Sequence, residues 1–156
     1  MFKKYTFFLC VSGLLLLISG CFPEQKKEGL FLVNVLDADY FVDCHIKAPN
    51  SVNVTLEGLD AFAQTLNPEK AEVVFYCSNY MCTASGFAAK SFMQKGFKHV
   101  WAYEAGMADW YQKGLPTEGS CKKEYLNKKI EKIELEDSSE IRIISTDELA
   151  NKLKQN

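Results

Sequence analysis

The residue types best suited to chemistry are two cysteines in the segment Tyr76-Cys77-Ser78-Asn79-Tyr80-Met81-Cys82-Thr83. Cys77 follows an apolar run at 72–76 that predicts a buried strand, and the pattern at 83–95 predicts a helix. A short loop between a strand and a helix can turn its N–H groups inward around an anion, and the helix N-terminus adds partial positive charge. We therefore predict a depressed pKa and a nucleophilic thiolate at Cys77.

The surrounding elements that position this loop alternate between strand and helix. Strands are predicted at 30–36, 51–54, 72–76 and 99–103, and helices at 39–43, 56–66, 83–95 and 105–112. This alternation predicts one α/β domain over 30–119, with a parallel sheet covered by helices. Functional sites in such sheets form beyond the carboxyl ends of the strands, which is where Cys77 is expected.

Four of the six cysteines lie after residue 30: Cys44, Cys77, Cys82 and Cys121. They allow three full disulfide pairings, among which the sequence does not choose. We expect Cys44 to be a small buried apolar residue and Cys121 to be an exposed loop thiol. A zinc site built from all four is not expected, because the usual C-x2-C pairs are missing, and no metal is predicted.

The charge balance excludes two classes of function. The chain has 18 basic and 20 acidic residues and a formal net charge of −2, so it lacks the basic face of a nucleic-acid-binding protein. Arg142 is the only arginine, which argues against any mechanism that needs a guanidinium fork in the site.

The N-terminal segment has the pattern of an export signal. Lys3 and Lys4 precede an uncharged apolar run at 5–20, which ends in Ile18-Ser19-Gly20-Cys21. This ending resembles the lipobox of bacterial lipoproteins. The resemblance implies a signal peptide at 1–20, a lipid on Cys21, a tether at 21–29 and a membrane-anchored protein outside the cytoplasm. The alternative is an uncleaved anchor helix with an incidental cysteine.

The C-terminal part has two segments. From 117 to 140 the composition shifts to Lys, Glu, Asp and Ser, so we expect a charged, solvated linker at 120–140. A strand is then predicted at 141–144 and a helix from Ser145 to Leu153, because Ser145 and Glu148 have the spacing of a capping box.

Several ordered motifs resemble those of rhodanese-like (sulfurtransferase) domains. The stretch 39–54 is similar to E-[YF]-x3-G-H-I-x-G-A-x-N-[IV], 73–77 matches the strand that leads to the catalytic cysteine, and 96–116 contains the closing G-[FY]-x-x-V and G-G-x-x-x-W-x-x-x-G-x-P signatures in altered form. The resemblance implies a rhodanese-like parallel sheet flanked by helices on both faces. It further implies transfer of sulfane sulfur from a small donor, such as thiosulfate, through a persulfide on Cys77 to a thiol acceptor, with no cofactor. The persulfide would be held by loop amides of Ser78, Asn79, Tyr80, Met81, Cys82 and Thr83.

The loop departs from the common family pattern, which often has arginine where Cys82 stands. The stretch Cys82-Thr83-Ala84-Ser85 looks like a subgroup with a C-x4-C loop, in which Cys82 is a candidate resolving thiol. Two other functions therefore stay open. One is a thiol–disulfide redox protein that uses Cys77 and Cys82, and the other is a non-catalytic binding module. The sequence identifies no protein partner.

The family's domains usually begin with a strand and helix of the form I-x-x-I-S-x-x-E-L-x-x-x-[IL], which is missing before residue 30. A similar pattern occurs at 141–153. This resemblance implies a circularly permuted arrangement in which the tail at 141–156 occupies the vacant edge of the sheet. The alternative is a remnant of a second domain or an independent tail.

Overall fold

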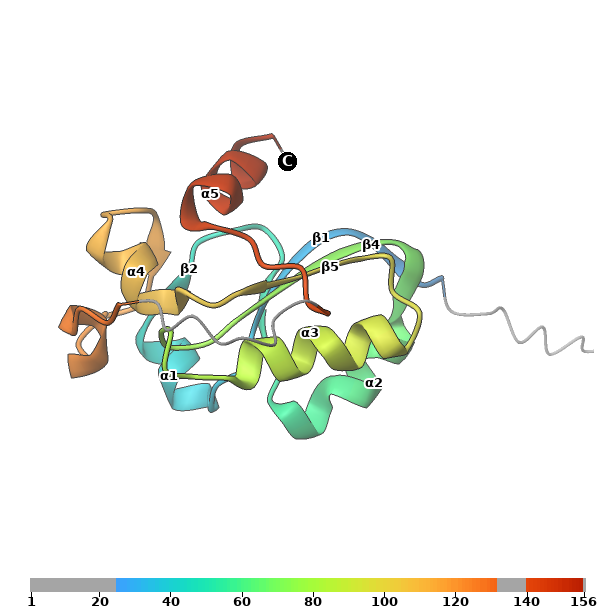
Figure 1. Cartoon of the computed structure of the whole chain (residues 1–156), viewed down its shortest axis with the longest axis horizontal. Helices are drawn as coiled ribbons and strands as arrows, with labels where there is room; N and C mark the ends of the chain where they lie inside the picture. Colours follow the sequence, from blue (N-terminus) through green and yellow to red (C-terminus); the bar gives the residue numbers. More distant parts are fainter. Residues whose placement is uncertain (1–24, 132–139, 156) are drawn as a thin grey trace, which may run out of the picture.

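The computed structural model describes residues 25–131 and 140–155, which form a four-stranded parallel sheet between two layers of helices (Figure 1). The strand order is β3-β1-β4-β5, and every neighbouring pair is parallel. The strands of this sheet are β1 (Lys27–Asn34), β3 (Ser51–Asn53), β4 (Leu66–Tyr76) and β5 (His99–Tyr103). A small antiparallel sheet is formed by β2 (His45–Ile46) and β6 (Thr117–Glu118).

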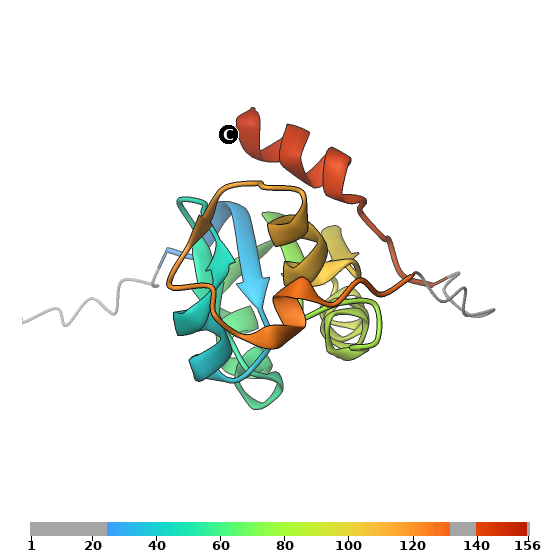
Figure 2. The ribbon, with the colours of Figure 1, turned by 90° about the vertical axis from the view of Figure 1, so that its left-hand side faces the viewer.

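Helices cover both faces of the parallel sheet. They are α1 (Ala38–Asp43), η1 (Leu56–Gly58), α2 (Leu59–Thr65), α3 (Ala84–Gln94), α4 (Gly106–Gln112), η2 (Glu124–Asn127) and α5 (Thr146–Lys154). Residues of α2 and α3 pack on one face, and residues of α4, η2 and α5 pack on the other. Figure 2 shows α3 and α5 on opposite sides of the sheet. The predicted α/β architecture is confirmed.

Burial on both faces explains why the last four residues of the central strand β4, 73–76, are apolar without interruption. Val73 and Phe75 of β4 lie in the core with α2 and α3, whereas Val74 and Tyr76 lie in the core with α4 and α5. Side chains alternate between the two faces of a strand, so a strand that is covered on both sides has no polar positions. The next residue, Cys77, continues the alternation and lies on the α3 side.

The segment after α4 differs from the expected solvated linker. Cys121 forms a disulfide with Cys44, and three backbone or side-chain donors from residues 120–123 bind the carboxylate of Asp43. Leu126 of η2 is 0% exposed. The expectation that Cys44 and Cys121 are separate thiols is therefore wrong, because the fold brings their Cα atoms to 4.6 Å across a separation of 77 residues.

The C-terminal tail extends the sheet at the free edge of β5, as predicted. Ala102 donates its N–H to the carbonyl of Arg142 at 2.8 Å, and Ile144 donates to the carbonyl of Ala102 at 3.0 Å. The predicted strand at 141–144 is reduced to one parallel bridge between Ala102 and Ile143. The capping box of Ser145 and Glu148 at the start of α5 is confirmed.

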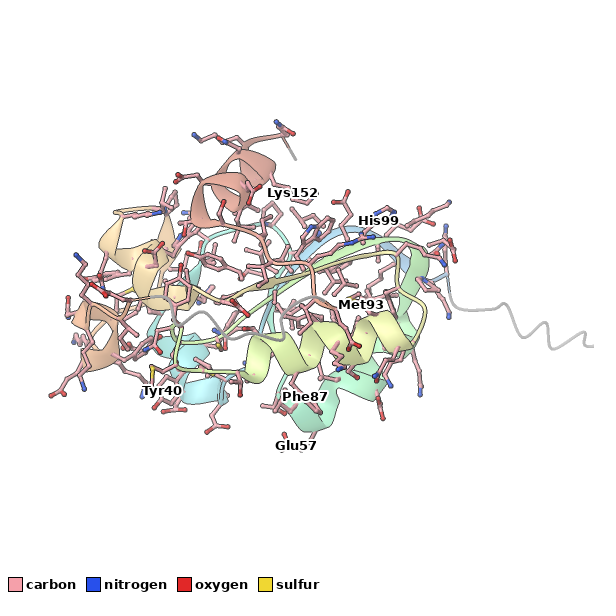
Figure 3. The ribbon with its side chains drawn as sticks, viewed as in Figure 1. Tyr40, Glu57, Phe87, Met93, His99 and Lys152 are labelled. Atoms are coloured by element: carbon pink, nitrogen blue, oxygen red, sulfur yellow. A yellow bond between two sulfur atoms is a disulfide. The ribbon has the colours of Figure 1, made fainter. Side chains whose placement is uncertain are left out.

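Side chains of α5 fix the tail on the sheet. Leu149 is 0% exposed within the core on this face. The ammonium of Lys152 lies 4.6 Å from the ring centre of Trp101 and pairs with Glu72, so it points from α5 toward the sheet (Figure 3). The tail is therefore a packed part of the domain.

Some predictions lie outside the described residues. These are the signal peptide at 1–20, lipidation at Cys21 and the middle of the linker at 132–139. Within the described part of the chain, no helix has the length and apolar character needed to cross a membrane.

Candidate functional site

The site is centred on Cys77, directly after β4 and at the carboxyl end of the parallel sheet. Cys77 is 0% exposed. Val35, which follows β1, donates its N–H to the carbonyl of Tyr76 at 3.1 Å, so the last residues of two strands hold the start of the loop. The prediction that Cys77 ends a buried strand is confirmed.

The Cys77 thiol contacts acceptors that favour its protonated form. It donates to the backbone carbonyl of Cys82 at 3.0 Å, and the carbonyl of Asn79 lies 3.9 Å away. Its other polar neighbour is the hydroxyl of Ser85, a buried residue in the first turn of α3, at 3.5 Å. The Cys82 side chain lies beside the same thiol, and each sulfur shifts the pKa of the other. The two thiols therefore titrate as a pair.

A turn built on Asn79 folds the loop back so that its two cysteines meet. The Asn79 side-chain oxygen accepts the N–H of Met81 at 3.0 Å, and its backbone carbonyl accepts the N–H of Cys82 at 2.9 Å. An asparagine that bonds the backbone two residues ahead forms an Asx-turn. This turn brings Cys82, which is partly exposed, next to the fully buried Cys77.

The pKa values of Cys77 and Cys82 are shifted in opposite directions. The hydrogen bond from Cys77 lowers the pKa of Cys82 to about 5, and the backbone amides of Ala84 and Ser78 contribute in the same direction. The hydrogen bond to Cys82, burial and the negative charge on Cys82 all raise the pKa of Cys77, and Ser85 offsets this only in part. The prediction of a resting thiolate at Cys77 is therefore wrong. The thiolate is on Cys82, because it is the more exposed sulfur and the one that accepts the hydrogen bond.

The first residues of α4 support the loop from the other side. Met107 and Ala108 donate their N–H groups to the carbonyls of Cys77 and Ser78, both at 2.9 Å. Gly106 has φ +65°, and a Cβ at this position would lie 2.7 Å from the Cys77 carbonyl oxygen. Only glycine allows such a close backbone approach in this conformation.

The predicted cradle at 78–83 is only partly brought together around the sulfur atoms. The amide of Ser78 faces Cys82, whereas Met81 is 62% exposed and Thr83 is also exposed. The amides of Ala84 and Ser85, just beyond the predicted range, face Cys82 and Cys77 respectively. Sequence reasoning missed Gly106, Ala84 and Ser85. The available signal for Ala84 and Ser85 was their position directly after the loop, whereas no sequence signal placed Gly106 beside it.

The surroundings of the loop are apolar or acidic rather than basic. Residues 78–83 contain no charged side chain. Burial raises the pKa of Tyr80, as does the nearby Asp109 carboxylate, and Lys113 opposes this. Phe87 is 63% exposed and projects from α3 away from the sheet (Figure 3). Among the described residues, no group of three or more His, Cys, Asp or Glu side chains is arranged to hold a metal ion.

A hollow of about 390 Å³ lies at the opposite end of the sheet. It is lined by residues near the starts of the strands, including Lys26, Pro68 and Phe97, and contains no cysteine. This hollow is separate from the thiol pair.

The chain belongs to the rhodanese-like domain family, whose sequence model matches residues 23–113. It is similar to the BH2092 protein of Bacillus halodurans, with 26% identity and a TM-score of 0.53. That alignment covers 60% of this chain and 66%, just under two thirds, of the other. It is also similar to the rhodanese-like domain of the Alr3790 protein of Anabaena sp., with 25% identity, a TM-score of 0.50 and coverage of 59% and 67%.

A third similar structure is the polysulfide-sulfur transferase of Wolinella succinogenes, with 28% identity, a TM-score of 0.49 and coverage of 58% and 66%. The comparison with curated proteins finds no match.

Proposed function

We propose that this protein is a sulfurtransferase that carries sulfane sulfur as a persulfide on Cys77. The observation that carries the proposal is the buried Cys77 thiol at the carboxyl end of β4, which donates to the Cys82 carbonyl at 3.0 Å and lies beside the Cys82 thiol, in a chain of the rhodanese-like family. The amide and hydroxyl of Ser85, at the start of α3, stand beside the Cys77 sulfur and favour its negative form.

Cys82 supplies the base that activates Cys77. As the Cys77 sulfur attacks the sulfane sulfur of a donor, its proton moves to the neighbouring Cys82 thiolate. With thiosulfate, a sulfur–sulfur bond forms to Cys77, the bond to the sulfonate breaks, and sulfite leaves. The persulfide then passes its outer sulfur to a thiol acceptor.

The donor must be held without a cation from the loop. Residues 78–83 carry no charge, and Arg142 is the only arginine in the sequence. Arg142 lies on the tail beside β5, where its guanidinium donates to the Lys98 carbonyl. Backbone amides therefore provide the anion binding in this proposal. A thiosulfate-type donor is accordingly expected to bind more weakly than at a site that also offers a guanidinium group.

Mass spectrometry of the reduced protein tests this function directly. Tryptic cleavage after Lys70 and Lys90 gives one peptide that contains both Cys77 and Cys82. Incubation with thiosulfate, or with inorganic polysulfide as a second donor, should add one sulfur atom to Cys77, either in the wild type or, if the second thiol of the loop removes this sulfur, in Cys82→Ser. Cys77→Ser should take up none at this position. If neither donor adds sulfur to the peptide of the wild type or of Cys82→Ser, and the wild type releases no sulfide, the proposed function is refuted.

A thiol–disulfide redox function is the second candidate, because the sulfur of Cys77 is already in contact with Cys82. This function requires both cysteines and no sulfur donor. Mild oxidation should then remove two hydrogens from the same tryptic peptide, and a dithiol should restore them. A peptide that stays reduced under mild oxidation would exclude this candidate.

We also propose that a lipid on Cys21 attaches the protein to a membrane. β1 begins at Lys27, six residues later, and runs parallel to β4, so the site lies at the opposite end of the sheet from the attachment. Six extended residues reach about 20 Å. The thiol pair would then face away from the bilayer. Cys21→Ala should move the protein from the membrane fraction to the soluble fraction, and unchanged partition would refute lipid anchoring.

A further inference from the structure

The loop places a second sulfur where it can act on a persulfide from within the same chain. The Cys77 sulfur donates to the Cys82 carbonyl at 3.0 Å and also contacts the Cys82 side chain. When Cys77 carries a persulfide, its own sulfur becomes the inner sulfur and keeps its covalent position. Cys82 therefore lies beside the inner sulfur, and attack on this sulfur requires the outer sulfur to point away from Cys82.

We propose that Cys82 attacks the inner sulfur of the Cys77 persulfide and releases the outer sulfur as hydrosulfide. The protein would then reduce sulfane sulfur to sulfide, rather than only carry it to an external acceptor. This inference rests on the proposed persulfide at Cys77.

The step balances in atoms and electrons. The Cys82 thiolate forms a bond to the Cys77 sulfur, the bond between the inner and outer sulfur breaks, and the outer sulfur leaves with its proton as HS⁻. Two electrons from the two cysteines reduce the sulfane sulfur, and Cys77 and Cys82 become a disulfide. A dithiol reductant, as a chemical class of co-substrate, returns this disulfide to the starting pair by thiol–disulfide exchange.

Leaving-group chemistry favours attack at the inner sulfur. Attack at the outer sulfur would expel the Cys77 thiolate, and burial and the neighbouring Cys82 raise the pKa of this group. A thiolate of raised pKa is a poor leaving group, because exchange is faster when the departing sulfur is less basic. Attack at the inner sulfur expels the small hydrosulfide ion instead, which does not leave a charge on the buried side chain.

Cys82 has the ionisation and the exposure that an attacking sulfur needs. In the resting protein the Cys77 thiol is the main cause of the lowered Cys82 pKa, and the amides of Ala84 and Ser78 act in the same direction. These amides stay beside Cys82 when Cys77 carries the persulfide, so they continue to favour its thiolate. Cys82 is also partly exposed, while Cys77 is fully buried. The dithiol reductant would therefore enter at Cys82, and its second thiol would supply the proton that Cys77 takes up as it leaves, so that no charge stays on the buried sulfur.

A single-turnover experiment tests the proposal on the purified full-length protein in mild detergent. The protein is reduced, freed of reductant without oxygen, and mixed with thiosulfate, which itself yields sulfite and no sulfide. We expect about one sulfide per protein molecule, together with a tryptic 71–90 peptide that has lost two hydrogens. Added dithiothreitol should restore the dithiol and permit a second equal release.

Variants separate this step from the loading step. Both Cys82→Ser and Cys82→Ala lack the base at Cys82, so they should load more slowly. After loading has run to completion, each should keep one added sulfur on Cys77 and release less than about a tenth of the wild-type sulfide. The persulfide on Cys77 in these variants would itself show that the loop is folded. Cys77→Ser should give neither persulfide nor sulfide.

Three results would overturn the proposal. A wild-type protein that holds a stable persulfide on Cys77 would show that Cys82 does not attack. An added sulfur found on Cys82 would show attack at the outer sulfur instead. In both cases the sulfurtransferase function would survive. Absence of sulfur uptake by both wild type and Cys82→Ser, from thiosulfate and from inorganic polysulfide, would overturn the sulfurtransferase function as well.

Discussion

Substitution of Gly106 by alanine should disturb the active loop more than any comparable change elsewhere on α4. The Cβ of Gly106→Ala would lie 2.7 Å from the Cys77 carbonyl oxygen and from the Ser78 carbonyl carbon, and 2.8 Å from the Asn79 nitrogen. All three neighbours are backbone atoms, so no side-chain rotation can relieve the clash. The loop itself has to move.

Gly114→Ala provides a matched control at the opposite end of the same helix. Gly114 has φ +66°, almost the same as +65° at Gly106, but a Cβ at Gly114 would meet nothing within 4 Å. Both variants lose about 1–2 kcal/mol, because alanine disfavours the left-handed conformation. Gly106→Ala loses about 1–3 kcal/mol more from overpacking. Its total destabilisation is therefore about 2–5 kcal/mol, a large part of the stability of a small domain.

The assays are urea unfolding with the native disulfide intact and the rate of sulfur loading on Cys77. Displacement of the loop should slow loading by about 10- to 100-fold in Gly106→Ala, since misplacement by about 1 Å costs up to two orders of magnitude. Alkylation should show the Cys82 pKa rising from about 5 toward the ordinary thiol value, because the contact with Cys77 weakens. Equal stabilities, loading rates and Cys82 pKa values in the two variants would refute this account of Gly106.

Three further predictions concern the thiol pair, the disulfide and the tail. Iodoacetamide should label Cys82 and spare Cys77 at neutral pH, with a rate that falls only as the pH drops through about 5. Cys77→Ala should move this midpoint upward, and an unchanged midpoint would contradict the shared hydrogen bond. Replacing Cys44 and Cys121 by alanine should lower the free energy of unfolding by about 3–5 kcal/mol, because the bond closes a loop of 77 residues. Reductant should have the same effect on the wild type in urea unfolding, and a cost near zero would contradict this. Leu149→Ala should lower the free energy of unfolding by about 2–4 kcal/mol, whereas an alanine at an exposed position of α5 should change it by less than about 0.5. Equal values would mean that the tail is not part of the folded unit.

Local sequence patterns predicted most of the elements and the position of Cys77. The part of a strand that is covered on both faces is apolar throughout, and this is visible at 73–76 without knowledge of the fold. The capping box of Ser145 and Glu148 was equally readable, because all its hydrogen bonds join residues three positions apart. Strand ends were less accurate: β4 begins at Leu66, where pairing with β1 extends it past Pro68.

Contacts between distant residues were outside the reach of the sequence. Four cysteines allowed three pairings, among which the sequence could not choose. In the fold, Gly119 approaches the Asp43 carbonyl so closely that a Cβ would lie 2.2 Å from the oxygen, and this approach brings Cys121 to Cys44. The tail had a readable strand–helix pattern, yet its partner was settled by the free hydrogen-bonding edge of β5. The small residue Gly106 acquired its role only when α4 met the loop.

The protonation of the site shows most clearly what the sequence determines and what the tertiary structure determines. The sequence by itself determined that two thiols flank a short loop between a strand and a helix, because those features depend on neighbouring residues. Only the tertiary structure decided which of them carries the negative charge. Charge depends on burial and on hydrogen-bond partners, and these favour Cys82 because it is the more exposed sulfur and receives the hydrogen bond from Cys77.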